Sequence, residues 1–158
     1  MTGNYLTLLE ESLRRKLQVM DEIQKYNLRQ QEIFQADDVD LDRFDEYVEE
    51  KGNLIEKLTA LDNGFEKLYA NVAEELKDNR EQYAEQIRTL QGLVTEVTDT
   101  SVAIQAQEAR NKKLLEDFFV KKRKDLHMNR KTSKAAIDYY RTMSRSAVMM
   151  PQYMDSKK

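Results

Sequence analysis

One stretch of acidic residues in this chain has the spacing of a calcium ligand set. When Asp38 is counted as position 1 of an EF-hand loop, Asp40, Asp42 and Glu49 stand at positions 3, 5 and 12, which carry calcium ligands. Such a loop needs glycine at its sixth position for a sharp turn, and the chain has Arg43 there. Because carboxylates also favour helix N-termini, we interpret the stretch as a loop that precedes a helix, and we expect no metal site.

Residues for nucleophilic or redox chemistry are almost absent. The chain has no cysteine and one histidine, His127, which excludes disulfides, thiolate metal sites and cysteine nucleophiles. A di-iron bundle needs Glu-x-x-His pairs, and Lys124 stands three residues before the histidine. Nothing marks an acid or an oxyanion site for serine–histidine catalysis, and no glycine-rich phosphate loop is present. We therefore expect a protein without cofactors that is not an enzyme.

The charges are distributed unequally. Residues 121–158 carry a net charge of +8 and residues 1–120 a net charge of -11, which sum to -3. The basic end could contact nucleic acid phosphates, with Tyr139 and Tyr140 available for base stacking. The acidic remainder and the lack of a docking motif argue against this, and basic residues also complement a helix C-terminus. We expect no nucleic-acid partner.

Long helices must position whatever this chain binds with. Its 158 residues include only 4 Gly and 1 Pro, with 40% hydrophobic and 35% charged residues, a composition typical of helical proteins. Apolar residues recur at spacings of three and four, as on one face of a helix. This pattern predicts helices over 5–34, 41–76 and 80–126, roughly 45, 54 and 70 Å long.

The connections between these helices carry turn and capping residues. We expect N-caps at Asn4 for the first helix and at Asp38 or Asp40 for the second. Residues 77–80 are predicted to form the second turn. The pair Asn63-Gly64 would make a turn between strands, but the apolar stripe continues in phase across it. We therefore predict a continuous second helix that is weakened or kinked at this pair.

The predicted fold class is all-α. We expect an elongated antiparallel bundle of three long helices over residues 1–126, followed by a basic, partly helical C-terminal tail over residues 127–158. The third helix is the longest, so it should overhang the others or pack its far end on something else. Within the tail, residues 133–144 could form a short amphipathic helix, with one side formed by Ile137, Tyr140 and Met143.

The third predicted helix changes character over residues 105–119. Its apolar stripe is interrupted by Gln105, Glu108, Arg110 and Asn111, and it resumes with Leu114, Leu115, Phe118 and Phe119. One interpretation is a polar layer that fixes the register of a bundle. The other is an overhanging half-helix that offers a groove to the i, i+3, i+4 and i+7 residues of an amphipathic partner helix. The sequence leaves both open.

Three stretches of the chain resemble FlgN-type flagellar export chaperones. Residues 44–58 contain the Lys-x-x-Leu-Ile-x-x-Leu pattern of that family as Lys51, Leu54, Ile55 and Leu58. Residues 61–69 and 104–111 are also similar to the family. The order of long helix, acidic loop, long helix, turn, long helix and basic tail matches over nearly the whole chain.

The resemblance implies a cytoplasmic, non-enzymatic chaperone of the flagellar type III export system. Such chaperones hold the C-terminal amphipathic segments of hook–filament junction proteins, prevent their premature assembly and help deliver them to the export gate. They contact clients through their C-terminal helical region, which implies as candidates Ile104, Asn111, Leu115, Phe118 and Phe119. Tyrosines near the C-terminal end help gate docking, which implicates Tyr139 or Tyr140.

A cytoplasmic location is also expected from the sequence itself. No apolar stretch approaches the ~20 residues that span a bilayer, so we expect no membrane insertion. The N-terminus lacks the basic and apolar regions of a secretory signal. Two other functions stay open: a structural coiled-coil adaptor that binds a constitutive partner or forms a homo-oligomer, and a nucleic-acid-binding helical protein that works through its basic tail.

Overall fold

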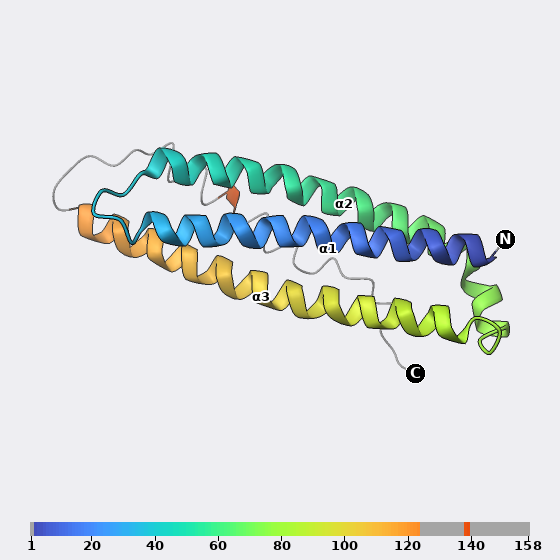
Figure 1. Ribbon diagram of the computed structural model, residues 1–158. Coiled ribbons are helices and arrows are strands. Elements are labelled where there is room, and N and C mark those ends of the chain that lie inside the picture. The colour runs from blue at the N-terminus through green and yellow to red at the C-terminus, as the bar shows by residue number, and fades with distance from the viewer. Residues whose placement is uncertain (1, 124–137, 140–158) are drawn as a thin grey trace.

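The computed structural model describes residues 2–123 and 138–139 and shows a bundle of three long helices. These are α1 (Thr2–Ile33), α2 (Leu41–Asp78) and α3 (Ala84–Lys122). The helices lie side by side, and the chain reverses direction at each connection (Figure 1). No strand occurs among the described residues. The predicted all-α, elongated antiparallel bundle is therefore confirmed.

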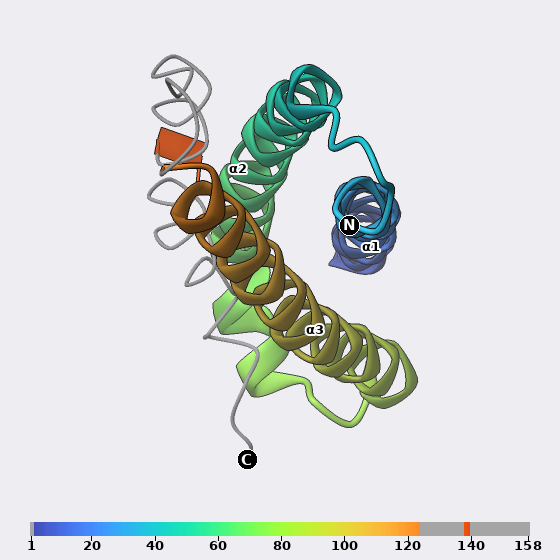
Figure 2. The same cartoon turned by 90° about the vertical axis from the view of Figure 1, so that its left-hand side faces the viewer.

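α1 holds the bundle together. It packs along both α2 and α3, whereas the backbones of α2 and α3 hardly approach each other within the described residues. Figure 2, which looks along the bundle, shows α1 on one side of the other two helices. We call the line along which α2 and α3 face each other the α2–α3 seam. Side chains that join these two helices must reach across a wider gap than those that contact α1.

The apolar stripes of the three helices face inward and form one core. Its fully buried apolar members are Leu6, Leu9, Leu13, Ile23, Phe44, Val72, Leu90, Val97 and Ile104. Burial of side chains of this size contributes about 1.5–3 kcal/mol each, before the loss of chain entropy is subtracted. Leu17 and Leu58, which follow the same spacing of apolar residues, lie at the edge of this core and are half-buried. The periodicity therefore identified the buried face of each helix.

The starts of α1 and α3 and the end of α2 differ from the predictions. α2 continues to Asp78, so the first two residues of the predicted turn at 77–80 are helical. α1 begins at Thr2, so the predicted N-cap at Asn4 is wrong. The hydroxyl of Thr7 donates to the carbonyl oxygen of Gly3 at 3.1 Å, because the helical turn already includes that carbonyl. α3 begins at Ala84 rather than at residue 80, because residues 80–83 form a turn after α2.

The predicted overhang of the third helix is wrong. α3 ends at Lys122 and has 39 residues, which gives a length of about 58 Å rather than ~70 Å. α2 has 38 residues and is about as long. The far end of α3 instead packs on Phe34, the residue that follows α1: the ring centroids of Phe34 and Phe118 are 6.1 Å apart.

The acidic loop serves as the start of α2. Asp40 is the N-cap, and its Oδ1 accepts a hydrogen bond from the backbone N of Arg43 at 3.0 Å. This confirms the predicted cap and explains one of the aspartates that had suggested calcium ligands. The bond satisfies one of the backbone donors that a helix start leaves without an intrahelical partner.

Replacing Asp40 with alanine is expected to lower the free energy of unfolding by about 1 kcal/mol, because that backbone donor loses its acceptor. Urea denaturation of the purified chain measures the change. Asp37→Ala is the matched control, since Asp37 is an exposed residue of the same loop. Equal losses in the two variants would contradict the capping role.

α2 runs without interruption through Asn63 and Gly64, as predicted. A methyl group added at Gly64 would meet no atom within 4 Å, and the backbone there has no positive φ. Gly64→Ala is therefore expected to raise the free energy of unfolding by about 0.5–1 kcal/mol. Gly92→Ala, at an equally open site inside α3, is the matched comparison. A gain at Gly92 alone would show that α2 frays near residue 64.

The predicted tail helix falls mostly outside the described residues. Asp138 and Tyr139 are helical, whereas the rest of the 133–144 segment, with its apolar side of Ile137, Tyr140 and Met143, lies outside the described part. Among the described helices, none combines the length and the apolar character needed to cross a membrane.

Candidate functional site

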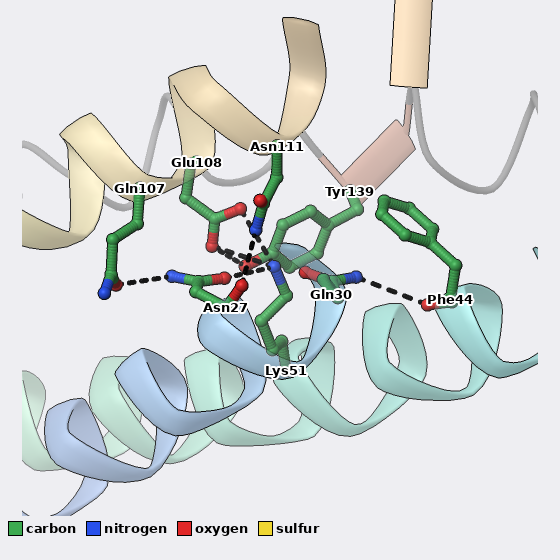
Figure 3. Close-up of polar contacts among 8 residues, drawn as sticks. All are labelled: Asn27, Gln30, Phe44, Lys51, Gln107, Glu108, Asn111 and Tyr139. Atoms are coloured by element: carbon green, nitrogen blue, oxygen red, sulfur yellow. Dashed lines mark hydrogen bonds and ion pairs between the residues drawn. The ribbon is translucent and has the colours of Figure 1, made fainter. Parts of the chain in front are cut away.

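A group of polar side chains is buried where the three helices meet. Lys51 of α2 is fully buried. Its Nζ donates to Asn27 Oδ1 at 2.6 Å and to Glu108 Oε1 and Oε2 at 2.9 and 3.0 Å. Figure 3 shows these side chains converging from α1, α2 and α3. We call Asn27, Lys51, Glu108, Asn111 and Tyr139 the polar cluster.

Asn27 joins α1 to both other helices. Its side-chain oxygen accepts from Lys51, and its Nδ2 donates to Gln107 Oε1 at 3.0 Å. Its backbone oxygen accepts from Asn111 Nδ2, also at 3.0 Å. A shift of α3 by one residue would break these bonds and leave buried polar groups without partners, which is costly. The polar-layer interpretation of α3 is therefore confirmed for Glu108 and Asn111.

Tyr139 reaches the polar cluster from outside the three helices. Its side chain is only 5% exposed, and its hydroxyl donates to Glu108 Oε2. The Lys51 ammonium lies 4.1 Å from the centre of its ring, a distance at which the ring face attracts a cation. Glu108 thus accepts hydrogen bonds from two side chains, and Tyr139 covers part of the ion pair.

Burial controls the protonation of Lys51. Removal from water lowers the pKa of Lys51 from 10.5 to about 8, although the charge and the hydrogen bonds of Glu108 act to raise it. The desolvation of the ammonium is therefore larger than the attraction of its carboxylate partner. Such a charge depends on its few partners, because no water can replace them.

A second ion pair joins α1 to α2 nearer the N-terminus. Lys16 Nζ lies 2.6 Å from Asp62 Oδ1, and the side chains are 5% and 20% exposed. Burial raises the pKa of Asp62, while the charge of Lys16 opposes the rise and Glu66 adds to it. This pair fixes α1 against α2, as the polar cluster fixes α1 against α3.

Aromatic rings close the end of the bundle beside the polar cluster. Phe34 packs edge-on against Phe44 with 5.5 Å between ring centroids. Phe118 contacts Phe34 and lies 6.0 Å from Phe119, and Lys122 Nζ is 5.8 Å from the Phe118 ring centre. Phe118 and Phe119 are half-buried, so each ring keeps some surface open to a partner.

The client-binding candidates on α3 share one face of that helix. Ile104, Asn111 and Leu115 are buried, with exposed fractions of 2%, 0% and 4%. Their spacing places Glu108 on the same face, between Ile104 and Asn111. The half-buried Phe118 and Phe119 continue this side of the helix to its end. Of the two gate-docking candidates, Tyr139 is buried against Glu108 and Tyr140 lies outside the described residues.

Sequence reasoning missed several residues that build this site. Asn27, Gln30 and Lys51 are fully buried, and Gln30 Nε2 donates to the backbone oxygen of Phe44 at 3.3 Å. The spacing of residues in the sequence could have identified Asn27 and Gln30 as buried. Asn27 and Gln30 continue the spacing of three and four after Ile23, so they occupy positions of the apolar stripe.

A comparison with known families identifies the family of the chain. A family model described as FlgN protein matches residues 1–139, a span that includes all three helices and Tyr139. The chain belongs to the FlgN family. It is therefore a FlgN-type flagellar export chaperone, as the resemblance implied. No curated protein gives a match to the chain, and no solved structure gives one either.

The stretches that resemble FlgN proteins also supply most of the polar cluster. Residues 44–58 contain Lys51, and residues 104–111 contain Glu108 and Asn111. In this FlgN-family chain, the two stretches lie on α2 and α3 and meet across the α2–α3 seam through the Lys51–Glu108 ion pair.

Proposed function

We propose that this FlgN-family chaperone binds the C-terminal amphipathic helices of hook–filament junction proteins in the cytoplasm. Binding would cover the apolar face by which these subunits later assemble, and so prevent premature assembly. The chaperone would then assist delivery of its client to the flagellar export gate. Membership of the family supports the general role, and the geometry of α3 supports the class of partner.

The face of α3 between Ile104 and Phe119 is the observation that carries this proposal. Its apolar side chains are Ile104, Leu115, Phe118 and Phe119, which stand at the spacing by which one helix packs on another. Ile104 and Leu115 are buried in the closed bundle, and Phe118 and Phe119 keep exposed surface. It also borders the α2–α3 seam, where the two helix backbones do not pack directly. An added helix could gain contacts there without first separating two closely packed backbones.

The exposure of these residues suggests an order of contact. Phe118 and Phe119 are half-buried, so they can meet a client helix while the bundle is closed. Ile104, Asn111 and Leu115 are buried and become available when the seam widens. Aromatic and aliphatic anchors of this kind carry most of the energy in such contacts, while the charged rim contributes little.

Docking at the export gate would involve Tyr139 or Tyr140. The Tyr139 ring is buried against the polar cluster, so a gate protein could reach it only after it leaves that position. This makes gate docking through Tyr139 dependent on a change in the bundle, such as the entry of a client.

Phe118→Ala is expected to weaken client binding by more than ~1 kcal/mol, about fivefold in affinity, because the variant loses an aromatic anchor. Co-purification with a co-expressed hook–filament junction protein measures the loss. Val120→Ala is the control, since Val120 is 55% exposed near the same end of α3. The bundle should keep its cooperative melting transition in both variants.

Equal recovery of client with both variants would contradict a role of Phe118 in binding. Loss of the melting transition in Phe118→Ala would show instead that the ring serves the core. A complex of the chain only with itself would favour the structural adaptor. Capture of nucleic acid that falls steeply with added salt would favour a role of the basic tail.

A further inference from the structure

Tyr139 is buried against the bundle although it belongs to none of the three long helices. We propose that Lys51 and Glu108 form a receptor site for a tyrosine side chain, which Tyr139 of the same chain occupies in competition with a client helix. The competition rests on the proposed function, whereas the receptor site itself rests on geometry alone. The arrangement is an autoinhibitory contact across the α2–α3 seam.

The receptor site has two features that together select a phenol. The Lys51 ammonium lies 4.1 Å from the ring centre of Tyr139 and attracts the face of an aromatic ring. The Glu108 carboxylate accepts a hydrogen bond from the ring hydroxyl, and a charged acceptor makes this bond stronger than a neutral one. Phenylalanine would satisfy only the first feature, and an aliphatic side chain would satisfy neither.

The site lies in the middle of the proposed client-binding face. Ile104, Glu108, Asn111 and Leu115 follow one another at spacings of four, three and four on α3, so they share one side of the helix. A client helix that contacts both Ile104 and Leu115 must pass over Glu108. Tyr139 contacts Glu108 from outside the three helices (Figure 3). The two occupants therefore exclude each other.

The contact of Tyr139 with Lys51 and Glu108 is small enough to form and break reversibly. Tyr139 contributes a single side chain, which donates a hydrogen bond to Glu108 and stacks its ring beside the Lys51 ammonium, whereas a client helix offers several anchors. Residues 1–120 and 121–158 carry opposite net charges, -11 and +8, and opposite charges attract. Glu108 stays paired with Lys51 when Tyr139 leaves, so its charge is not left unpartnered.

The receptor site can be tested on the full chain without any client. Nitration of Tyr139 by tetranitromethane, followed by mass spectrometry, reports how often the ring leaves the site. We expect at least tenfold faster nitration of Tyr139 in Glu108→Gln than in the wild type. Asp117→Asn removes the carboxylate of an exposed ion pair on the same helix and is the matched control. A retained melting transition shows that the bundle is intact.

A peptide of residues 132–146 gives a second test of the receptor site. It should bind the full-length Tyr139→Ala chain, whose site is vacant, at least tenfold more tightly than the wild type, whose site is occupied. The same peptide with Tyr139→Phe should bind less tightly, because it lacks the hydroxyl. Unchanged nitration in Glu108→Gln, or equal binding of the peptide to both chains, would overturn the receptor site.

The competition is tested with a C-terminal segment of a hook–filament junction protein. We expect Tyr139→Ala to bind it at least threefold more tightly than the wild type, with Tyr139→Phe between them. Val102→Ala, at a 60% exposed position of α3, should bind like the wild type. Equal or weaker binding by Tyr139→Ala would overturn the competition. If no chain binds the segment, the proposed function and the competition with its client both fail, and nitration and the peptide still decide the receptor site.

Discussion

Lys51→Met is expected to lower the free energy of unfolding by about 3–5 kcal/mol at neutral pH, the largest loss among the substitutions considered. The substitution leaves the buried Glu108 carboxylate without its cation, and it also removes the donor to Asn27. No water can take the place of the ammonium at a site this deeply buried. Urea denaturation of the wild type and the variant measures the loss.

The double variant Lys51→Met/Glu108→Met separates the burial of a charge from the loss of packing. Since it removes both charges and keeps similar volumes, we expect it to recover at least half of the loss seen in Lys51→Met. Asp117→Asn at the exposed Lys113–Asp117 pair should change the stability by less than about 0.5 kcal/mol. If Lys51→Met lowered the free energy of unfolding by no more than Asp117→Asn does, the polar cluster would not contribute to stability as proposed.

The pH dependence of stability should show the lowered pKa of Lys51. The pKa is about 8 in the folded chain, against 10.5 for a lysine side chain in water, the value that applies to the unfolded chain. Between these values the unfolded chain binds one more proton at this residue, so the free energy of unfolding rises with pH. The rise is ~1.4 kcal/mol per pH unit, or about 3 kcal/mol over the interval.

Comparison with Lys51→Met isolates this contribution from the other groups that titrate in alkali. The difference in unfolding free energy between wild type and variant should widen from pH 8 to pH 10. Urea denaturation at intervals of one pH unit measures it. Parallel pH profiles would show that Glu108 compensates fully for the burial of the ammonium and that the pKa is normal.

The helices could be predicted because the information for them is local. Spacings of three and four in the apolar residues identify a buried face whatever it packs against. Asp40 could be recognised as an N-cap because capping depends on residues within one helical turn. The end of α3 was harder to place, since residues 123–126 include no Gly or Pro to stop a helix.

The polar cluster could not be assembled from the sequence because it depends on how three helices align. Lys51 stands three residues after Val48 and four before Ile55, so its position on the buried face was visible. A lysine at such a position usually extends its charge to solvent. Only the alignment that brings Asn27 and Glu108 opposite its ammonium makes burial favourable.

Tyr139 shows a second limit of sequence reasoning. The predicted tail helix placed its apolar side at Ile137, Tyr140 and Met143, and Tyr139 was not among these residues. Its partner Glu108 lies 31 residues away, and no periodicity links them. The contact follows from chemical complementarity in space, which a one-dimensional pattern does not contain.

Titration calorimetry of the full-length wild-type chain with the C-terminal segment of a hook–filament junction protein tests the central claim most directly. A segment from the middle of the same junction protein serves as the control. We expect saturable one-to-one binding of the C-terminal segment with micromolar or tighter affinity, and no binding of the control. Absence of binding, or equal binding of both segments, would contradict the proposal that this FlgN-family chaperone recognises the C-terminal helices of hook–filament junction proteins.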